Sequence, residues 1–257
     1  MNFRYVSSCR SGCSTLTSHL QGSKGKDDLG YWNEFVQRFF SHKAFFRHTI
    51  LIKEGESQDG KQYELAYPSL ARYFHTHYES GIKTMQLVLD KVTADKQLPN
   101  DCHFMESKAS LVYWFESGSH VSVCQNPPGS FGTDKLDQLV ATGVLRAQFD
   151  SEQKIELFEF ATMSHDEYIS RDVVIQSARP LHNWNKEWRS LNQQDGTHSP
   201  EMSNKKSKPK GFKSPNSAPP EFDLPQSSTK HGWGITHAVH QFLEVCRYDN
   251  LAEVTCN

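Results

Sequence analysis

The hydrophobic residues that follow Asp28 recur at intervals of three and four, which is the spacing of one face of an α-helix. Asp27 or Asp28 can cap this helix, because a short acidic side chain accepts a hydrogen bond from the first free backbone amides. A core helix packed on a sheet explains so many aromatic side chains on one face better than a ligand cage does. The face consists of Tyr31, Trp32, Phe35, Val36, Phe39 and Phe40.

A β-hairpin and a second helix are predicted next. Apolar residues dominate positions 45–53, the chain turns polar after Gly55, and an extended pattern resumes over residues 61–66. This order predicts two strands joined by a loose loop. Pro68 suits the first turn of a helix, and Gly81 can end it. The apolar face of this second helix comprises Leu70, Tyr73, Phe74, His77 and Tyr78.

From Lys83 onward hydrophobic positions alternate with polar ones, which is typical of β-strands with one buried face. Long neighbouring strands joined by turns indicate antiparallel pairing. Val121 and Val123 mark a short strand before a Pro- and Gly-rich loop. The positions expected to face the core are Met85, Leu87 and Leu89; Met105, Ala109, Leu111, Tyr113 and Phe115; Leu145, Ala147 and Phe149; and Ile155, Leu157, Ala161 and Met163.

Helices that come first and long strands that follow predict an α+β fold. Packing the N-terminal helices inside a strongly curved antiparallel sheet is the economical way to bury both. We therefore predict an NTF2-like cone, with a cystatin-like sheet around a single helix as the alternative.

The pattern weakens after Arg171. Trp184 and Trp188 lie four residues apart, which is consistent with a short docking helix. Residues 192–229 are polar and include six prolines, so we predict a disordered linker there. Order returns near His231, and Thr236 is a natural cap for a helix that carries an apolar stripe. That stripe cannot form a core alone, so it must dock on the domain or on a partner.

These patterns divide the chain into five parts. We predict a poorly ordered N-terminus at residues 1–26, a folded domain at 27–191 and the linker at 192–229. A docking helix at 230–247 and a tail at 248–257 complete the chain.

Composition agrees with a partly folded protein. Only 36% of the 257 residues are hydrophobic, and the 12% that are aromatic point to an aromatic-rich core. The net charge of −2 gives no overall field that would favour DNA or an anionic membrane. The six cysteines contain no CxxC pair, so we predict an intracellular chain in which Cys9 and Cys13 are plain thiols. No apolar run is long enough to cross a membrane, and no secretory signal is expected.

Catalytic patterns are weak. The sequence contains no Gly-rich phosphate loop, no Gly-x-Ser-x-Gly and no His-Glu-x-x-His. His75 and His77 point to different sides of their helix, and His237 with His240 has no carboxylate at ligand spacing, so we expect neither metal nor cofactor. The alternative function is an acid/base pocket or small-molecule site inside the cone. Its candidate residues are Asp90, His48, Tyr73 and His77.

Several strings, in their order and spacing, resemble the LIM-domain-binding/SEUSS family of transcriptional co-regulators in its fungal form. The run at residues 22–40 is similar to the entry of the family's dimerisation domain, with an acidic turn before a Trp- and Phe-rich helix. Residues 46–48 continue it, and residues 67–74 resemble the family's helix with Leu followed by Arg-Tyr-Phe. Residues 234–244 resemble the fungal segment after the linker. The similarity extends over about residues 16–245.

The resemblance implies a nuclear, non-enzymatic adaptor that forms homodimers and bridges DNA-binding transcription factors. It also implies a co-regulator partner with a LisH domain, and neither a membrane nor direct sequence-specific DNA contact. The expected dimerisation residues, on strand faces away from the core, are Trp114, Val112, Phe158 and Phe160. The expected partner-binding residues are Trp184, Trp188, Ile235, Val239, Phe242 and Leu243. The cluster Lys205, Lys206, Lys208 and Lys210 can serve as a nuclear-import signal or as a solvated part of the linker.

Two departures from the family pattern stand out. The C-terminal LIM-interacting segment of animal members has no counterpart here, so the sequence does not predict LIM binding itself. The helix after Phe242 is expected to stop where the sequence changes to Arg247-Tyr248-Asp249-Asn250.

Overall fold

A computed structural model describes residues 16–20, 25–116, 136–192, 214–215, 217–222, 224 and 226–255. They form two compact units, one up to Tyr168 and again from Ser227 on, the other over Ile169–Gln226. The elements of the first unit are α2 (Leu29–Phe39), β1 (Phe40–Glu54), β2 (Ser57–Ala66), α3 (Tyr67–Glu79), β3 (Ile82–Gln97), β4 (His103–Glu116), β5 (Leu136–Phe149), β6 (Ile155–Tyr168) and α5 (His237–Thr255). The second unit contains α4 (Arg171–Asn192).

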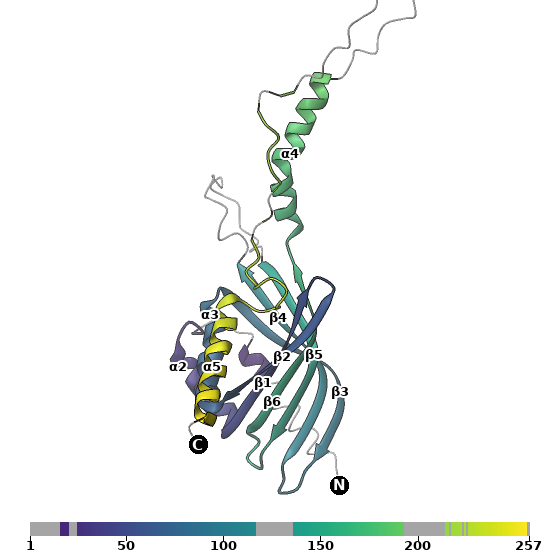
Figure 1. Ribbon diagram of the computed structural model, residues 1–257. Helices are drawn as coiled ribbons and strands as arrows, with labels where there is room; N and C mark the ends of the chain where they lie inside the picture. Colours follow the sequence, from purple (N-terminus) through teal and green to yellow (C-terminus); the bar gives the residue numbers. More distant parts are fainter. Residues whose placement is uncertain are drawn as a thin grey trace, which may run out of the picture. The chain divides into compact units, whose positions relative to one another are not determined.

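The predicted aromatic helix is confirmed as α2. Asp28 is its N-cap, and its carboxylate accepts a hydrogen bond of 2.8 Å from the Gly30 amide. Trp32 is fully buried and stacks on Phe74 of α3, with ring centroids 5.5 Å apart. Figure 1 shows α2, α3 and α5 grouped on one side of the sheet.

The predicted hairpin is confirmed as β1 and β2, but its turn is tight rather than loose. Glu54 pairs with Ser57, so the strands continue up to a turn at Gly55 and Glu56. Gly55 has φ of 61°, a left-handed conformation that glycine adopts without strain.

The described residues form a sheet of six strands in the order β2-β1-β6-β5-β4-β3. The strands joined by turns pair antiparallel, as predicted, whereas β1 and β6 are parallel, so the predicted antiparallel sheet contains one parallel pair. The reason is topological. After β2 the chain crosses through α3 to the far edge and returns strand by strand, so that β6 arrives beside β1 in the same direction.

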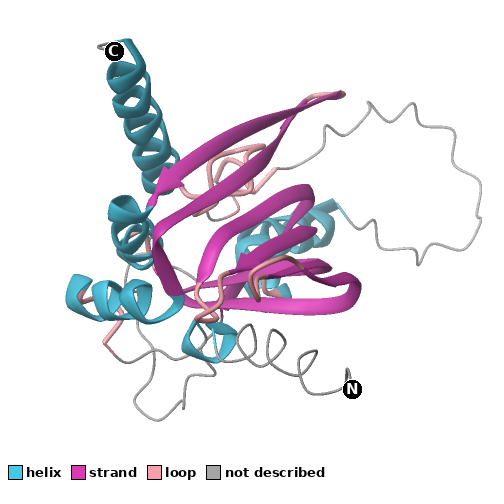
Figure 2. Ribbon diagram, turned by 90° about the horizontal axis from the view of Figure 1, so that it is seen from below, coloured by secondary structure: helices cyan, strands magenta, loops and turns pink. Residues whose placement is uncertain are grey.

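The predicted fold class is confirmed, because N-terminal helices pack in a strongly curved sheet as an NTF2-like cone. Figure 2 shows the bend of the sheet. The cystatin-like alternative has a single helix in its sheet, whereas here both α2 and α3 contribute buried aromatic side chains to one core.

Strand β6 reverses its predicted faces. Phe149 pairs with Ile155 but Gln148 pairs with Leu157, so Glu156 is an extra residue in a β-bulge. The bulge turns Phe158 and Phe160 into the core, with 5% and 0% of their surfaces exposed. They are therefore wrong as residues of an exposed face. Leu157, Ala161 and Met163 are correspondingly not core residues, and 67% of the Met163 surface is exposed.

Both remaining helices are longer than expected. α4 has 22 residues instead of forming a short docking helix. α5 continues through residues 247–250 to Thr255, so the predicted stop before the tail is wrong. Val121, Val123 and Lys205 to Lys210 lie outside the described residues. None of the described helices is both long and apolar enough to span a membrane.

Candidate functional site

The face of the sheet turned away from α2 and α3, here called the outer sheet face, carries an apolar group. Val112 pairs with Val140 across β4 and β5, and Trp114 lies two residues further along β4. Val112 is 8% exposed and is not part of the core cluster. Trp114 is half-buried, and 54% of Tyr168 in the same cross-strand row is exposed. Two of the four predicted dimerisation residues, Trp114 and Val112, thus lie on this face.

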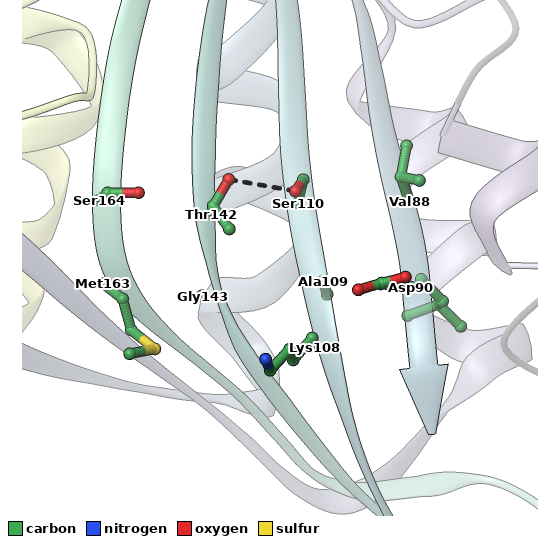
Figure 3. A pocket seen from close by; sticks show the side chains of 10 residues that line it. Val88, Asp90, Lys108, Ala109, Ser110, Thr142, Gly143, Met163 and Ser164 are labelled. Carbon is green, nitrogen blue, oxygen red and sulfur yellow. Dashed lines mark hydrogen bonds between the residues drawn. The ribbon is translucent and has the colours of Figure 1, made fainter. Parts of the chain in front are cut away.

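A shallow groove of about 710 Å³ continues the outer sheet face (Figure 3). A row of paired residues from β3 to β6 runs across it, and the hydroxyls of Ser110 and Thr142 lie 3.2 Å apart. Val88 and Met163 are exposed at opposite sides of the groove, and Lys108 lies between them. Hydroxyls flanked by apolar side chains on an open surface suit contact with another protein rather than enclosure of a small molecule.

A ladder of alternating charges crosses five strands on the outer sheet face. The Arg146 guanidinium lies 2.7 Å from the Glu106 carboxylate and 2.6 Å from that of Glu159. Arg47 bridges Glu159, at 3.4 Å, to Glu64, at 2.8 Å. Hydrogen bonds to Glu64 and Glu106 raise the pKa values of Arg47 and Arg146, respectively. Every arginine of the ladder is thereby matched by carboxylates.

The interior holds three of the four acid/base candidates. Tyr73 Oη lies 2.9 Å from His48 Nδ1, and the His77 ring stacks on Tyr113 at 5.4 Å between centroids. Burial lowers the pKa of His48 to about 4 and that of His77 to about 3, so both rings are neutral near pH 7. Asp90 is exposed and lines the groove of the outer sheet face instead. Asp90, the one carboxylate among the four candidates, is therefore not part of this cluster.

The space inside the cone is small. Aromatic and aliphatic side chains, including Phe40, Phe74 and Phe158, leave a cavity of about 20 Å³. That volume holds about one water molecule, whereas ligand pockets measure roughly 300–1,000 Å³. Within the described residues, neither ring nitrogen of His77 has a hydrogen-bond partner.

Helix α5 docks on the chain's own domain. Ile235, Val239 and Leu243 are 4%, 0% and 0% exposed and belong to the core cluster. Thr236 caps the helix, because its hydroxyl accepts a 3.3 Å hydrogen bond from the Val239 amide. Burial removes these three apolar residues from any partner surface, so the prediction that they contact a partner is wrong. Phe242 is half-buried, 6.4 Å from Tyr73 between ring centroids.

A turn before α5, here called the C-terminal clasp (residues 229–236), holds the helix in place. The Lys53 amide donates a 2.8 Å hydrogen bond to the Gly232 carbonyl. His165 Nε2 lies 3.2 Å from the same carbonyl, and burial lowers the pKa of this histidine. At the far end of the contact, Glu244 of α5 accepts hydrogen bonds from Lys61, at 2.6 Å, and from Tyr63. Sequence reasoning missed the clasp, although two glycines around Trp233 were a signal.

Helix α4 has an apolar side that no described residue buries. Val174, Leu181 and Trp188 are seven residues apart in turn, Trp184 lies three residues after Leu181, and Leu191 lies three residues after Trp188. No α4 residue is buried, and 44% of Leu191 is exposed. Trp184 Nε1 donates a 2.9 Å hydrogen bond to the Ser217 carbonyl. We call these five residues the α4 stripe.

Neither histidine pair forms a metal site in the described part of the chain. His75 Nε2 forms a hydrogen bond of 2.9 Å with the Asp27 carbonyl oxygen, and His240 Nε2 lies 3.0 Å from Lys230 Nζ. The described residues contain no group of three or more His, Cys, Asp or Glu side chains placed to hold a metal ion. Cys9 and Cys13 lie outside them.

Comparisons with known proteins identify one family and two fungal relatives. The family model described as LIM-domain binding protein matches residues 14–248. Adhesion defective protein 1 of Schizosaccharomyces pombe is 31% identical over 159 residues, which is 61% of this chain and 36% of that protein. Transcriptional activator ptaB of Aspergillus fumigatus is 31% identical over 235 residues, which is 90% of this chain and 27% of that protein. The chain thus spans only about a third and a quarter of these relatives.

Solved structures resemble the chain more distantly. An NTF2-like protein of unknown function from Exiguobacterium is 8% identical with a TM-score of 0.34, over 59% of this chain and 97% of that one. A putative polyketide cyclase from Acidithiobacillus ferrooxidans is 15% identical with a TM-score of 0.31, over 70% of this chain and 98% of that one. Similarity at this level supports no inference on activity.

Proposed function

Because this chain belongs to the family of LIM-domain-binding proteins, we propose that it is a transcriptional co-regulator that works as an adaptor between proteins, without enzymatic activity. The name of the Aspergillus relative, transcriptional activator ptaB, supports a role in transcription. The cavity between Phe40, Phe74 and Phe158, which has room for about one water molecule, supports an adaptor rather than a small-molecule enzyme.

The α4 stripe carries the proposal. An isolated amphipathic helix is marginal in water, and an exposed apolar stripe is stabilised when a partner covers it. Trp184 and Trp188 are of the residue type that most often dominates binding energy at interfaces. The adaptor docks a LisH-domain co-regulator on the α4 stripe, as the family resemblance implies, and together they bridge DNA-binding transcription factors in the nucleus.

The outer sheet face is the proposed surface for self-association. Val112, Val140 and Trp114 form an apolar group between polar rows, and the charge ladder lies on the same face. In a dimer with two-fold symmetry, the same face of each subunit meets the other, so the apolar group of one subunit can pack on that of its partner. The core residues Phe158 and Phe160 have no part in this surface.

Affinity purification of the tagged full chain tests partner docking. The variant Leu181→Ser/Trp188→Ser removes two residues of the α4 stripe, and Asn183→Ser/Glu187→Ser is the control on exposed positions outside it. We expect a LisH-domain protein with the wild type and the control, and at least a tenfold loss with the stripe variant. Equal recovery in all three samples contradicts the proposed docking surface.

Sedimentation velocity tests self-association separately. We expect a dimer for the wild type at micromolar concentration, and a monomer for Trp114→Glu because a charge cannot be buried in an apolar interface without a partner. Glu152→Gln, at an exposed turn before β6, is the control and stays dimeric. A monomeric wild type rejects self-association.

A further inference from the structure

Helix α4 has a second side that the adaptor function does not use. Arg179, His182, Lys186 and Arg189 follow one another at intervals of three, four and three, so they lie along one side of the helix. All four are exposed. At a rise of about 1.5 Å per residue they extend over about 15 Å. We call them the α4 basic row.

Within the part of the chain that the structure describes, the α4 basic row has no ion pairs, unlike the cations on the outer sheet face. Arg47 and Arg146 on the outer sheet face each contact two carboxylates, and Lys61 contacts Glu244. Among the described residues, no carboxylate forms an ion pair with the α4 basic row. The helix as a whole carries four Lys and Arg against Asp172 and Glu187, a net charge of +2 in a chain of −2. Within the described residues, no carboxylate thus neutralises the α4 basic row.

A hollow beside this row is lined by groups that donate hydrogen bonds. His182, Lys186 and Arg189 line it together with Asn185 and Ser190, and its volume is about 460 Å³. Glu187 faces a neighbouring hollow that also touches Lys186. No apolar side chain is present among the described lining residues of the first hollow, so it offers nothing to the side chains of a typical peptide ligand.

We propose that the α4 basic row binds the phosphate backbone of a nucleic-acid duplex. Guanidinium groups match phosphate oxygens in a two-pronged geometry, and a row of cations at helical spacing can follow a charged backbone. Such contacts carry no sequence information, so they add affinity to a complex whose sequence specificity comes from bridged transcription factors. A membrane surface fits less well, because Trp184 on the apolar side donates its N–H to the Ser217 carbonyl instead of standing free.

Fluorescence anisotropy with the full chain and a labelled 20-base-pair duplex tests the proposal over a series of salt concentrations. Arg179→Gln/Lys186→Gln/Arg189→Gln removes three cations of the row. Arg38→Gln/Lys43→Gln/Arg72→Gln removes the same charge from exposed positions of the other unit. We expect at least tenfold weaker binding at 50 mM salt for the first variant only. The slope of log affinity against log salt should also fall by about 2.7, since each lost phosphate contact removes about 0.9.

Three results overturn the proposal. These are a wild type that does not bind the duplex at 50 mM salt, equal loss of affinity in both triple variants, and unchanged affinity in the first variant with loss only after substitution of Lys205 to Lys210. Polyglutamate and vesicles of phosphatidylserine are assayed alongside, and binding to either without binding to the duplex also rejects it. Recovery of the LisH-domain protein is measured with the same variant and should stay unchanged, so failure here is distinguishable from failure of the adaptor function.

Discussion

The first unit, which contains the sheet, and helix α4 of the second unit differ in how far their side chains are buried and paired. In the first unit, aromatic side chains from α2, α3 and the sheet share one core, and the arginines of the charge ladder are paired with carboxylates. In α4 no residue is buried, and the α4 basic row has no ion pair within the described residues. The side chains of the first unit stabilise its own fold, whereas those of α4 remain exposed, and we propose that they bind partners.

This contrast separates two kinds of aromatic residue that look alike in the sequence. Trp32 is fully buried and donates a 2.9 Å hydrogen bond to the Lys26 carbonyl, whereas Trp184 and Trp188 are half-buried. Substitutions in the two regions should therefore affect different measurements, folding in one case and binding in the other.

The largest expected effect is that of Trp32→Ala. Removing a buried indole leaves a cavity and an unpaired carbonyl, so we expect a loss of about 3–5 kcal/mol in the free energy of unfolding. Trp184→Ala should cost less than about 1 kcal/mol, because its side chain is not part of a core. Urea unfolding followed by circular dichroism measures both. Equal losses of unfolding free energy for the two variants would contradict the difference between the buried Trp32 and the half-buried Trp184.

Gly232→Ala should have the next largest effect. Gly232 has φ of 75°, and a Cβ there would lie 2.2 Å from the Lys53 carbonyl oxygen. Backbone strain and displacement of this strand contact should cost about 3 kcal/mol. Gly55→Ala is the control, since its φ is 61° but no atom lies within 4 Å of the added Cβ, so it should cost only about 1–2 kcal/mol. Unfolding of both variants in urea gives the comparison, and faster hydrogen exchange in α5 should accompany Gly232→Ala alone.

Acid should destabilise the first unit, because it contains two buried histidines. The pKa values of His48 and His77 fall from 6.5 to about 4 and about 3 on folding, so the unfolded chain binds more protons below pH 6.5. The stability that neutral rings provide is complete above pH 6.5 and is lost as the pH falls towards 4. Each histidine should contribute a loss of about 2 kcal/mol at pH 5.

His77→Phe isolates this effect. Phenylalanine keeps a ring beside Tyr113 but cannot be protonated, and it removes two buried nitrogens that lack partners. We expect its unfolding free energy to decrease less than that of the wild type between pH 7 and pH 5. Identical pH profiles would mean that His77 is solvated in the folded protein. His182→Phe on exposed α4 should leave the profile unchanged.

The smallest expected effect concerns the charge ladder. Glu159 lies between two arginines, and Glu159→Gln should cost about 1 kcal/mol because partly exposed ion pairs contribute little each. The loss should shrink in 1 M NaCl, where surface charges are screened. Glu187→Gln on α4 should have no measurable effect on unfolding. A larger loss for Glu187 than for Glu159 would reverse the comparison.

Local signals in the sequence were sufficient for the helices and the hairpin. Asp28, the aromatic spacing after it, and Pro68 each specify structure within a few residues, and the structure agrees at all three places. The fold class followed from the order of elements. Two predictions of strand geometry failed because they depend on how strands pair, which the alternation of apolar residues within one strand does not specify. One extra residue at Glu156 reversed the faces of β6, and the parallel pairing of β1 with β6 has no local pattern.

The candidate surfaces were predictable only in part. The alternation and spacing in the sequence placed Trp114 and Val112 off the core face and Trp184 and Trp188 on one helix, and the structure has them there; their roles in binding stay predictions. The docking of Ile235, Val239 and Leu243 on the chain's own domain was not, since a stripe does not reveal which surface covers it. The charge ladder needs the register of five strands, and that register appears only in the folded sheet.

The parallel pairing of β1 with β6 has a consequence for synthesis on the ribosome. Thr49 pairs with Ala161, so β1 lacks its central neighbour until more than a hundred further residues have been translated. At roughly 5–20 residues per second this delay lasts on the order of ten seconds. During that time Phe46, later in contact with Phe158, has no partner on one side. The nascent chain is therefore expected to need chaperone protection of its N-terminal hairpin until β6 emerges.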